Sequence, residues 1–373
     1  MSIKNRFFTS TMPGMTGMGY SPGTLVNNMK KVLVDGSASV ALTSIVIAAN
    51  KAKAYVSDTA LFKQAVVEIT GSGVVGVDGT FRITATGTGW FEYDVTGVAD
   101  QTITGALSFR YPSLGWSQIY FANNTLVVRH ANAAKSQPYY RISDNENHAA
   151  RAMFYETMTD INTGTYPVPA HLAVSGGVGW PKNSHGSGSR NWVMFGNDEV
   201  FYYLSFHYYG YSCLVGMGLF KPREGYNDQY TNFIAGAENN DNFYSDVNRP
   251  SLTYTPDWGV YFERDAFDIY RSVAGLKAAR YHYPTNGYAG TSGTEFVNKG
   301  NNEILLGEVN LFELGVLRGE LKGVEFCLQS MPAGIFSNLE VVDLTINSVT
   351  KPYLTICDTE MNRGIFLDLN RTW

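Results

Sequence analysis

Short apolar runs dominate the chain, and most of them combine β-branched and aromatic residues with alternating apolar and polar positions. Glycine, asparagine and aspartate separate the runs, as they do where turns join strands. Clear examples are VALTSIVIAA (40–49), AVVEIT (65–70), QIYFANNTLVVRH (118–130), VFYYLSFHYYGY (200–211) and LEVVDLTI (339–346). This pattern predicts a mainly β fold, with a large antiparallel β-sandwich-like domain, a small inserted β-barrel and few short helices.

Helical spacing of apolar positions is clearest in TLVNNMKKVLV (24–34). Leu25, Met29 and Val32 fall on one side of a helix there, and Asp35-Gly36 would end it. The spacing in residues 264–280 is also compatible with a helix. We therefore expect short helices only at these two places.

The composition along the chain divides it into three parts. Residues 1–24 are rich in Met, Gly, Pro, Ser and Thr without periodicity, so we expect an extended N-terminal arm that is ordered only where a neighbouring molecule holds it. Residues 51–107 contain short runs punctuated by glycine, with Asp78-Gly79 at a hairpin turn, and predict a small β-barrel module. Residues 25–50 and 108–373 then form the main β-sandwich-like domain.

The composition excludes several classes of protein. Of the 373 residues, 16% are charged, against roughly 25% in an ordinary soluble domain, and 14% are aromatic. Disordered chains and coiled coils have the opposite bias. The net charge of −5 and the lack of a basic block argue against nucleic acid as a partner. Sparse charge with abundant tyrosine instead favours a chain that buries part of its surface against other chains.

Cysteine use and the N-terminal sequence indicate synthesis in the cytoplasm. Cys213, Cys327 and Cys357 are odd in number and lack metal-binding spacing, so we interpret them as reduced thiols. The N-terminus has no apolar segment typical of a signal peptide. The longest apolar stretch, residues 40–49, is too short to cross a bilayer, so we expect no membrane insertion.

Each motif with a possible chemical role also has a structural explanation. Residues 71–76 match GxGxxG, but a turn and a strand follow, where dinucleotide binding needs a helix. Residues 186–189 (GSGS) lack the strand–turn–helix context of a nucleophilic serine. The six histidines, His130, His148, His171, His185, His207 and His282, show no zinc-ligand spacing.

Carboxylates and amides give two further candidates. Glu263, Asp265 and Asp268 lie close in sequence, as the carboxylate pair of a glycosidase can, although such clusters are common on solvated surfaces. Residues 239–242 (NNDN) could ligate calcium but lack the spacing of an EF-hand loop. We therefore expect no enzymatic activity, no catalytic residue, no cofactor and no metal site.

The aromatic run at residues 200–211 has three possible roles: core, subunit interface or carbohydrate platform. Alternation buries one face of a strand in any case, and tyrosine is also favoured at protein interfaces. The residues that we predict at an interface are Tyr202, Tyr203, Tyr208, Tyr209, Tyr211, Trp180 and His185.

Three features stand in an order that resembles a family of tailed-bacteriophage virion proteins of the tail and baseplate type. The first is LVNNMKKVLVDG (25–36), followed by the glycine-rich module with ITGSG and GVDGTFRITATGTGWFEYDV. The second is LGWSQIYFANNTLVVRH (114–130), followed by YYRISDNENHAARAMFYETMTDINTGTYPVP (139–169). The third is RGELKG (318–323), a turn at Met331-Pro332 and a last strand ending in Asp368-Leu369 and Trp373. The resemblance is strongest in residues 105–170, and residues 240–300 depart from the pattern.

The resemblance implies a structural subunit of the virion, located in the tail, baseplate or a tail-attached component, and implies no catalytic residue. The expected partners are copies of the chain itself, as a trimer or hexamer, and other phage tail or virion proteins. One alternative is a receptor-binding tail protein that recognises a glycan or protein on the host cell surface. A second alternative is a tail-borne polysaccharide depolymerase.

Overall fold

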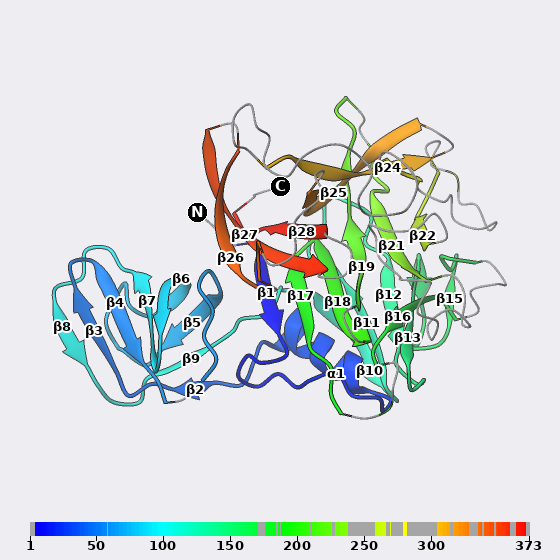
Figure 1. Ribbon diagram of the computed structural model, residues 1–373. Coiled ribbons are helices and arrows are strands. Elements are labelled where there is room, and N and C mark those ends of the chain that lie inside the picture. The colour runs from blue at the N-terminus through cyan, green and yellow to red at the C-terminus, as the bar shows by residue number, and fades with distance from the viewer. Residues whose placement is uncertain are drawn as a thin grey trace.

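The computed structural model describes residues 4–370 apart from residues 58, 171–175, 184–185, 187, 209–210, 226–227, 238–257, 266–268, 270–278, 282–303, 314–315, 328–334, 338, 347 and 359–362. Strands make up 52% of the structure and helices 4%. The strands form curled antiparallel sheets, which confirms the predicted fold class. Figure 1 shows a small lobe, which we call the module, beside a larger body.

The largest sheet of the body has eleven strands, and its order differs widely from the order along the chain. The path runs through β1 (Arg6–Thr9), β17 (Trp192–Gly196), β18 (Val200–Tyr208), β19 (Tyr211–Leu219), β21 (Asn232–Ala237), β16 (Val178–Pro181), β13 (Ala149–Tyr155), β12 (Tyr139–Ser143), β11 (Thr125–Arg129) and β10 (Ser117–Ala122), and β22 (Trp258–Phe262) pairs with β21. Every residue of β17 and of β21 is buried, as expected for strands covered on both faces.

A seven-stranded sheet packs against this sheet and completes the sandwich-like body. Its path is β23 (Ala279–Tyr281), β24 (Leu306–Glu313), β25 (Val316–Cys327), β28 (Arg363–Asp368), β27 (Val349–Asp358) and β26 (Val341–Ile346), and β20 (Lys221–Pro222) pairs with β25. The Tyr202 hydroxyl on β18 donates to the carbonyl of Lys322 on β25 at 2.9 Å. Leu321, Val324 and Leu354 join the same apolar core as Phe195. A separate hairpin pairs β14 (Thr157–Met158) with β15 (Gly164–Thr165).

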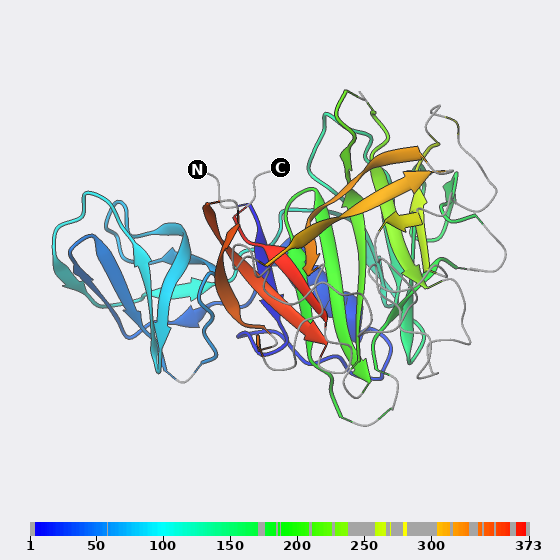
Figure 2. The same cartoon turned by 45° about the horizontal axis from the view of Figure 1, so that its top comes forward.

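The module is an eight-stranded curled sheet at the side of the body (Figures 1 and 2). Its path is β2 (Val40–Ala41), β9 (Ser108–Arg110), β5 (Val66–Thr70), β6 (Gly79–Gly87), β7 (Trp90–Asp94), β4 (Lys51–Tyr55), β3 (Ser44–Ala48) and β8 (Gln101–Ile103). The sheet therefore runs from Val40 to Arg110, whereas the sequence predicted a module over residues 51–107. Phe91 and Phe109 pack edge to face at 5.1 Å in its interior.

The N-terminal segment is held by its own chain. Residues 6–9 form β1, which pairs with β17 along its whole length, and Phe7 and Phe8 are buried. Met12, Met15 and Met18 are buried in the core as well. The expectation that a neighbouring molecule must order residues 1–24 is therefore corrected for residues 4–24. Apolar side chains attach this segment to the body. Their spacing in the sequence is too irregular to predict a helix or a strand.

The helix predicted at residues 24–34 is present as α1 (Thr24–Lys30), which continues into a π-helical turn at Lys31–Asp35. Leu25 and Met29 face the core as the spacing predicts. Of residues 264–280, most lie outside the described residues, and the last two belong to β23. No helix in the described part of the chain is long and apolar enough to cross a membrane.

Candidate functional site

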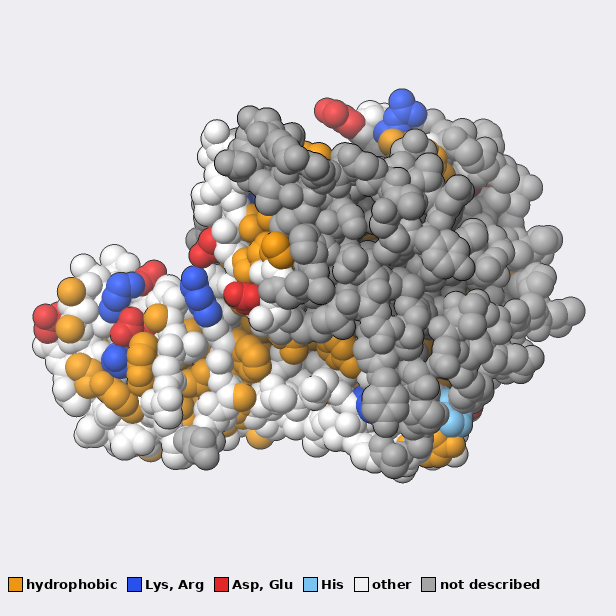
Figure 3. Space-filling view, in the orientation of Figure 1, with side chains coloured by type: hydrophobic (Ala, Val, Ile, Leu, Met, Phe, Trp, Pro, Cys, Tyr) orange, Lys and Arg blue, Asp and Glu red, His pale blue; other side chains and the backbone are white. Residues whose placement is uncertain are grey.

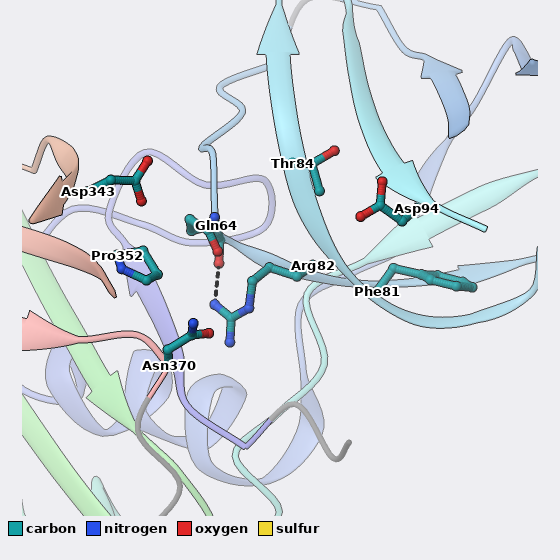
Figure 4. A pocket seen from close by; sticks show the side chains of 8 residues that line it. All are labelled: Gln64, Phe81, Arg82, Thr84, Asp94, Asp343, Pro352 and Asn370. Atoms are coloured by element: carbon teal, nitrogen blue, oxygen red, sulfur yellow. Dashed lines mark hydrogen bonds between the residues drawn. The ribbon is translucent and has the colours of Figure 1, made fainter. Parts of the chain in front are cut away.

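A cleft lies where the module meets the body, and its volume is about 400 Å³. The module contributes side chains from β6 and β7 and from the loop before β5, and the body contributes the β26–β27 hairpin and Asn370, which follows β28 (Figure 4). In the space-filling view the surface is hollowed between the two lobes (Figure 3). The lining residues are Gln64, Phe81, Arg82, Thr84, Asp94, Asp343, Pro352 and Asn370.

Arg82 is the central residue of this cleft because its guanidinium joins three separate segments. Nη1 donates to the carbonyl of Gln64 at 2.8 Å, and Nη2 donates to the carbonyls of Asn5 and Leu369, each at 3.1 Å. Burial, together with the nearby Arg6 guanidinium, lowers the pKa of Arg82 to about 10. Arg82 therefore stays charged at neutral pH, although its environment opposes the charge.

The two carboxylates in the lining are neutralised by lysines. Asp94 Oδ1 lies 2.9 Å from Lys51 Nζ on the adjacent strand, and Asp343 Oδ2 lies 3.2 Å from Lys63 Nζ. The second ion pair also connects the module to the body. Both pairs are exposed, so each adds little to stability. These pairs matter because each lysine neutralises one carboxylate of the cleft lining.

Two amide side chains complete the lining next to Arg82. Gln64 has a positive φ of 67°, which is uncommon for a residue with a side chain. Asn370 is exposed, and its backbone N–H donates to Asp368 Oδ1 at 2.8 Å. Figure 4 shows the Arg82 guanidinium between the side chains of Gln64 and Asn370. The arrangement can hold a small polar ligand through several donors and acceptors at once.

Three of the residues predicted at an interface instead fill the core of this chain. Trp180, Tyr202 and Tyr203 are at most 1% exposed. Trp180 Nε1 donates to the carbonyl of Ala235 at 3.0 Å, and the Tyr203 hydroxyl donates to the carbonyl of Pro181 at 2.9 Å. These side chains cannot reach a second molecule, so their interface role is corrected to a core role. Alternation does not separate the two roles where both faces of a strand are covered.

The remaining predicted interface residues are described in part or not at all. Tyr208 ends β18, Tyr211 begins β19, and the two are paired in the register of these strands. Their side chains, and all of Tyr209 and His185, lie outside the described residues. Their interface role stays a prediction.

The GxGxxG match is a structural turn, as its sequence context predicts. Asp78 Oδ1 accepts the backbone N–H of Ser72 at 3.0 Å, so the carboxylate of the chain itself occupies the loop. A Cβ on Gly71 would lie 2.2 Å from the carbonyl oxygen of Ala106, and the φ of Gly71 is +93°, which explains the glycine. The segment continues into strand β6, so the helix that would bind a pyrophosphate is missing from this place.

The structure places Glu263 and Asp265 in separate hydrogen-bond networks. Both are buried and use different partners: Glu263 Oε2 accepts from Asn232 Nδ2 at 2.8 Å, and Asp265 Oδ1 accepts the N–H of Ile269 at 2.9 Å. Asp268 and residues 239–242 lie outside the described residues. Within the part of the chain that the structure describes, no three His, Cys, Asp or Glu side chains come together as a metal site would require.

Glu263 gives a testable pH dependence, because burial raises its pKa. The folded state then keeps this proton to a higher pH than the unfolded state, so stability falls as pH rises between the two pKa values. Glu263→Gln keeps an acceptor oxygen for Ser136 and Asn232 but cannot ionise. We expect the stability of the variant relative to the wild type to improve from about pH 4 to about pH 7, measured by urea unfolding. A constant difference across this range would contradict the assignment.

The cleft residues were not among the candidates that the sequence offered. Gln64, Arg82, Asp343 and Asn370 come from segments far apart in the chain, and none belongs to a recognisable motif. Only the folded arrangement brings these residues together.

No protein-family model matches the chain, and no curated protein matches its sequence.

Proposed function

We propose that the chain is a structural subunit of a bacteriophage virion, in the tail or baseplate or attached to the tail, and that it acts through self-assembly and contacts with neighbouring virion proteins. The observation that carries this proposal is the edge of the eleven-stranded sheet. The segment with the strongest resemblance to tail and baseplate proteins, residues 105–170, includes the β10–β11 hairpin at that edge.

Strand β10 is the outermost strand on its side of the sheet. Ile119 and Tyr120 are half-buried, and Phe121 is 38% exposed with Lys30 Nζ 5.6 Å from its ring centroid. An apolar strand with one open edge favours pairing with a strand of another chain. A bulge between Gln118 and Tyr120 leaves residues 120–122 as the regular part of this edge.

This edge replaces the tyrosine-rich run as the support for assembly. The largest side chains of that run which the structure describes are in the core, so the aromatic content of the chain alone does not indicate an interface. An edge strand provides unsatisfied backbone donors and acceptors as well as apolar side chains. Both contribute to a specific contact between subunits.

The test is Phe121→Lys, which places a charge on the edge and should weaken pairing. We expect the wild-type chain to form oligomers in native mass spectrometry and to be present in purified phage particles. The variant should form fewer oligomers and enter particles less efficiently. Val75→Lys is the control, since Val75 is 97% exposed on the module. Absence of the wild-type chain from purified particles would overturn the proposal, and equal behaviour of both variants would overturn the role of β10.

A second candidate function is recognition of the host cell surface, and the cleft is the observation that favours it. A virion protein with a polar ligand site in an open cleft is suited to binding a host glycan. Binding of the purified chain to host cells, or inhibition of infection by it, would support this function. Release of reducing sugar from host polysaccharide would instead favour a depolymerase.

A further inference from the structure

The base of the cleft has unused hydrogen-bond donors. A guanidinium has five N–H groups, and the three carbonyls of Asn5, Gln64 and Leu369 use three of those on Arg82. The remaining two are available to a ligand. The side-chain amides of Gln64 and Asn370 lie on either side of the guanidinium in the close-up view and can donate to the same group (Figure 4).

The charge balance at this point favours an anion. Asp94 and Asp343 are each paired with a lysine, so neither neutralises Arg82. Within the described residues Arg82 has no ion-pair partner, since the three groups that it contacts are neutral carbonyls. Asp368 attracts it electrostatically but is itself within 3.6 Å of Lys351 Nζ. Both hydrogens of Nη2 already bind carbonyls, so a carboxylate here accepts single charge-assisted hydrogen bonds from the remaining Nε–H or Nη1–H.

The rest of the lining suits a polyhydroxylated ligand better than a peptide. Strand β6 is paired with β5 and β7 on its two sides, and Asp343 and Pro352 are a cross-strand pair on β26 and β27. The cleft is thus lined by side chains and not by an open strand edge, which an extended peptide would need for β-addition. Carboxylate, amide and hydroxyl groups can bind several sugar hydroxyls, while Phe81 and Pro352 provide apolar surface.

We propose that the cleft binds a sugar that carries a carboxylate. The carboxylate binds Arg82 and the amides of Gln64 and Asn370, and the ring hydroxyls reach Asp94, Asp343 and Thr84. The volume of about 400 Å³ lies within the range of small-molecule sites. This inference goes beyond assembly, because it concerns the isolated chain and holds whether or not β10 pairs with another subunit.

The first experiment measures binding of glucuronic acid, galacturonic acid and N-acetylneuraminic acid to the full chain by saturation-transfer NMR and calorimetry. Glucose and galactose are the neutral controls for the two uronic acids. We expect at least one acidic sugar to bind about tenfold or more tightly than its neutral counterpart. The proposal is overturned if none of the three acidic sugars binds, or if the neutral sugars bind equally well.

Variants then test the position of the carboxylate. Asn370→Asp places a negative charge beside Arg82 while leaving the carbonyl contacts of Arg82 intact, and should weaken binding of the acidic sugar by about tenfold or more. Asn123→Asp adds the same charge in the exposed β10–β11 turn and should leave binding unchanged. Equal affinity of the two variants would overturn the site.

N-acetylglutamate amide serves as a probe for a peptide carboxylate. If it binds as tightly as the acidic sugars, the ligand is an acidic protein segment and the sugar proposal fails. These measurements use the isolated chain, whereas the assembly proposal is tested in phage particles, so either can fail without the other.

Discussion

Lys182→Met should lower the free energy of unfolding by about 3–5 kcal/mol. The side chains of Lys182 and Asp144 are both 0% exposed and form an ion pair in the core. Lys182 Nζ also donates to the carbonyls of Ser21, at 3.2 Å, and Glu146, at 2.7 Å. Removing the cation leaves a buried carboxylate without its counter-charge, and that carboxylate also accepts the N–H groups of Leu25 and Val26 at the start of α1. Chemical unfolding monitored by tryptophan fluorescence measures the loss.

The control for Lys182 is Lys51→Met, which removes the cation of the exposed pair with Asp94 and should change stability little. The double variant Lys182→Met with Asp144→Asn should recover part of the stability, because asparagine still accepts from the helix amides without a charge. A loss for Lys182→Met as small as that for Lys51→Met would show that the buried pair contributes little.

Trp180→Ala should lower the free energy of unfolding by about 3–5 kcal/mol because it opens a cavity in the core. The indole is 0% exposed and stacks on Phe201 at 6.1 Å between ring centroids. Its hydrogen bond to the carbonyl of Ala235 would also be lost. Urea unfolding measures stability, and native mass spectrometry of the same samples measures oligomerisation.

This prediction separates the core role of Trp180 from the interface role that the sequence suggested. Trp180→Phe should cost less, since it keeps much of the volume and loses the hydrogen bond. Val75→Ala, at a position that is 97% exposed, should change stability by no more than about 0.5 kcal/mol. Normal stability of Trp180→Ala with impaired oligomerisation would restore the interface role.

The fold class could be predicted from the sequence because its signals are local. Alternation and β-branched runs identify strands such as Val66–Thr70 and Val341–Ile346, and helical spacing identifies α1. Each signal depends on neighbours within one element. The order of strands in the sheets, by contrast, places β1 beside β17 and β16 beside β21, and no local pattern specifies such partners.

The cleft could not be predicted for the same reason. In the sequence Arg82 is an ordinary polar residue of a strand. Its role in the cleft depends on its hydrogen bonds to the carbonyls of Asn5 and Leu369. A sequence pattern does not indicate which backbone carbonyls a side chain will contact. Likewise, nothing in the sequence around Asp144 indicates that its carboxylate accepts the backbone N–H of Leu25 at the start of α1, 119 positions away.

The contacts of Arg82 also have a consequence for the order of folding. The strands of the module pair within residues 40–110, whereas Arg82 joins residues that are 77 and 287 positions away. Closing long loops costs more conformational entropy and slows the formation of such contacts. The module can therefore fold as a local unit, while its junction with the body forms only when both ends of the chain have been brought together.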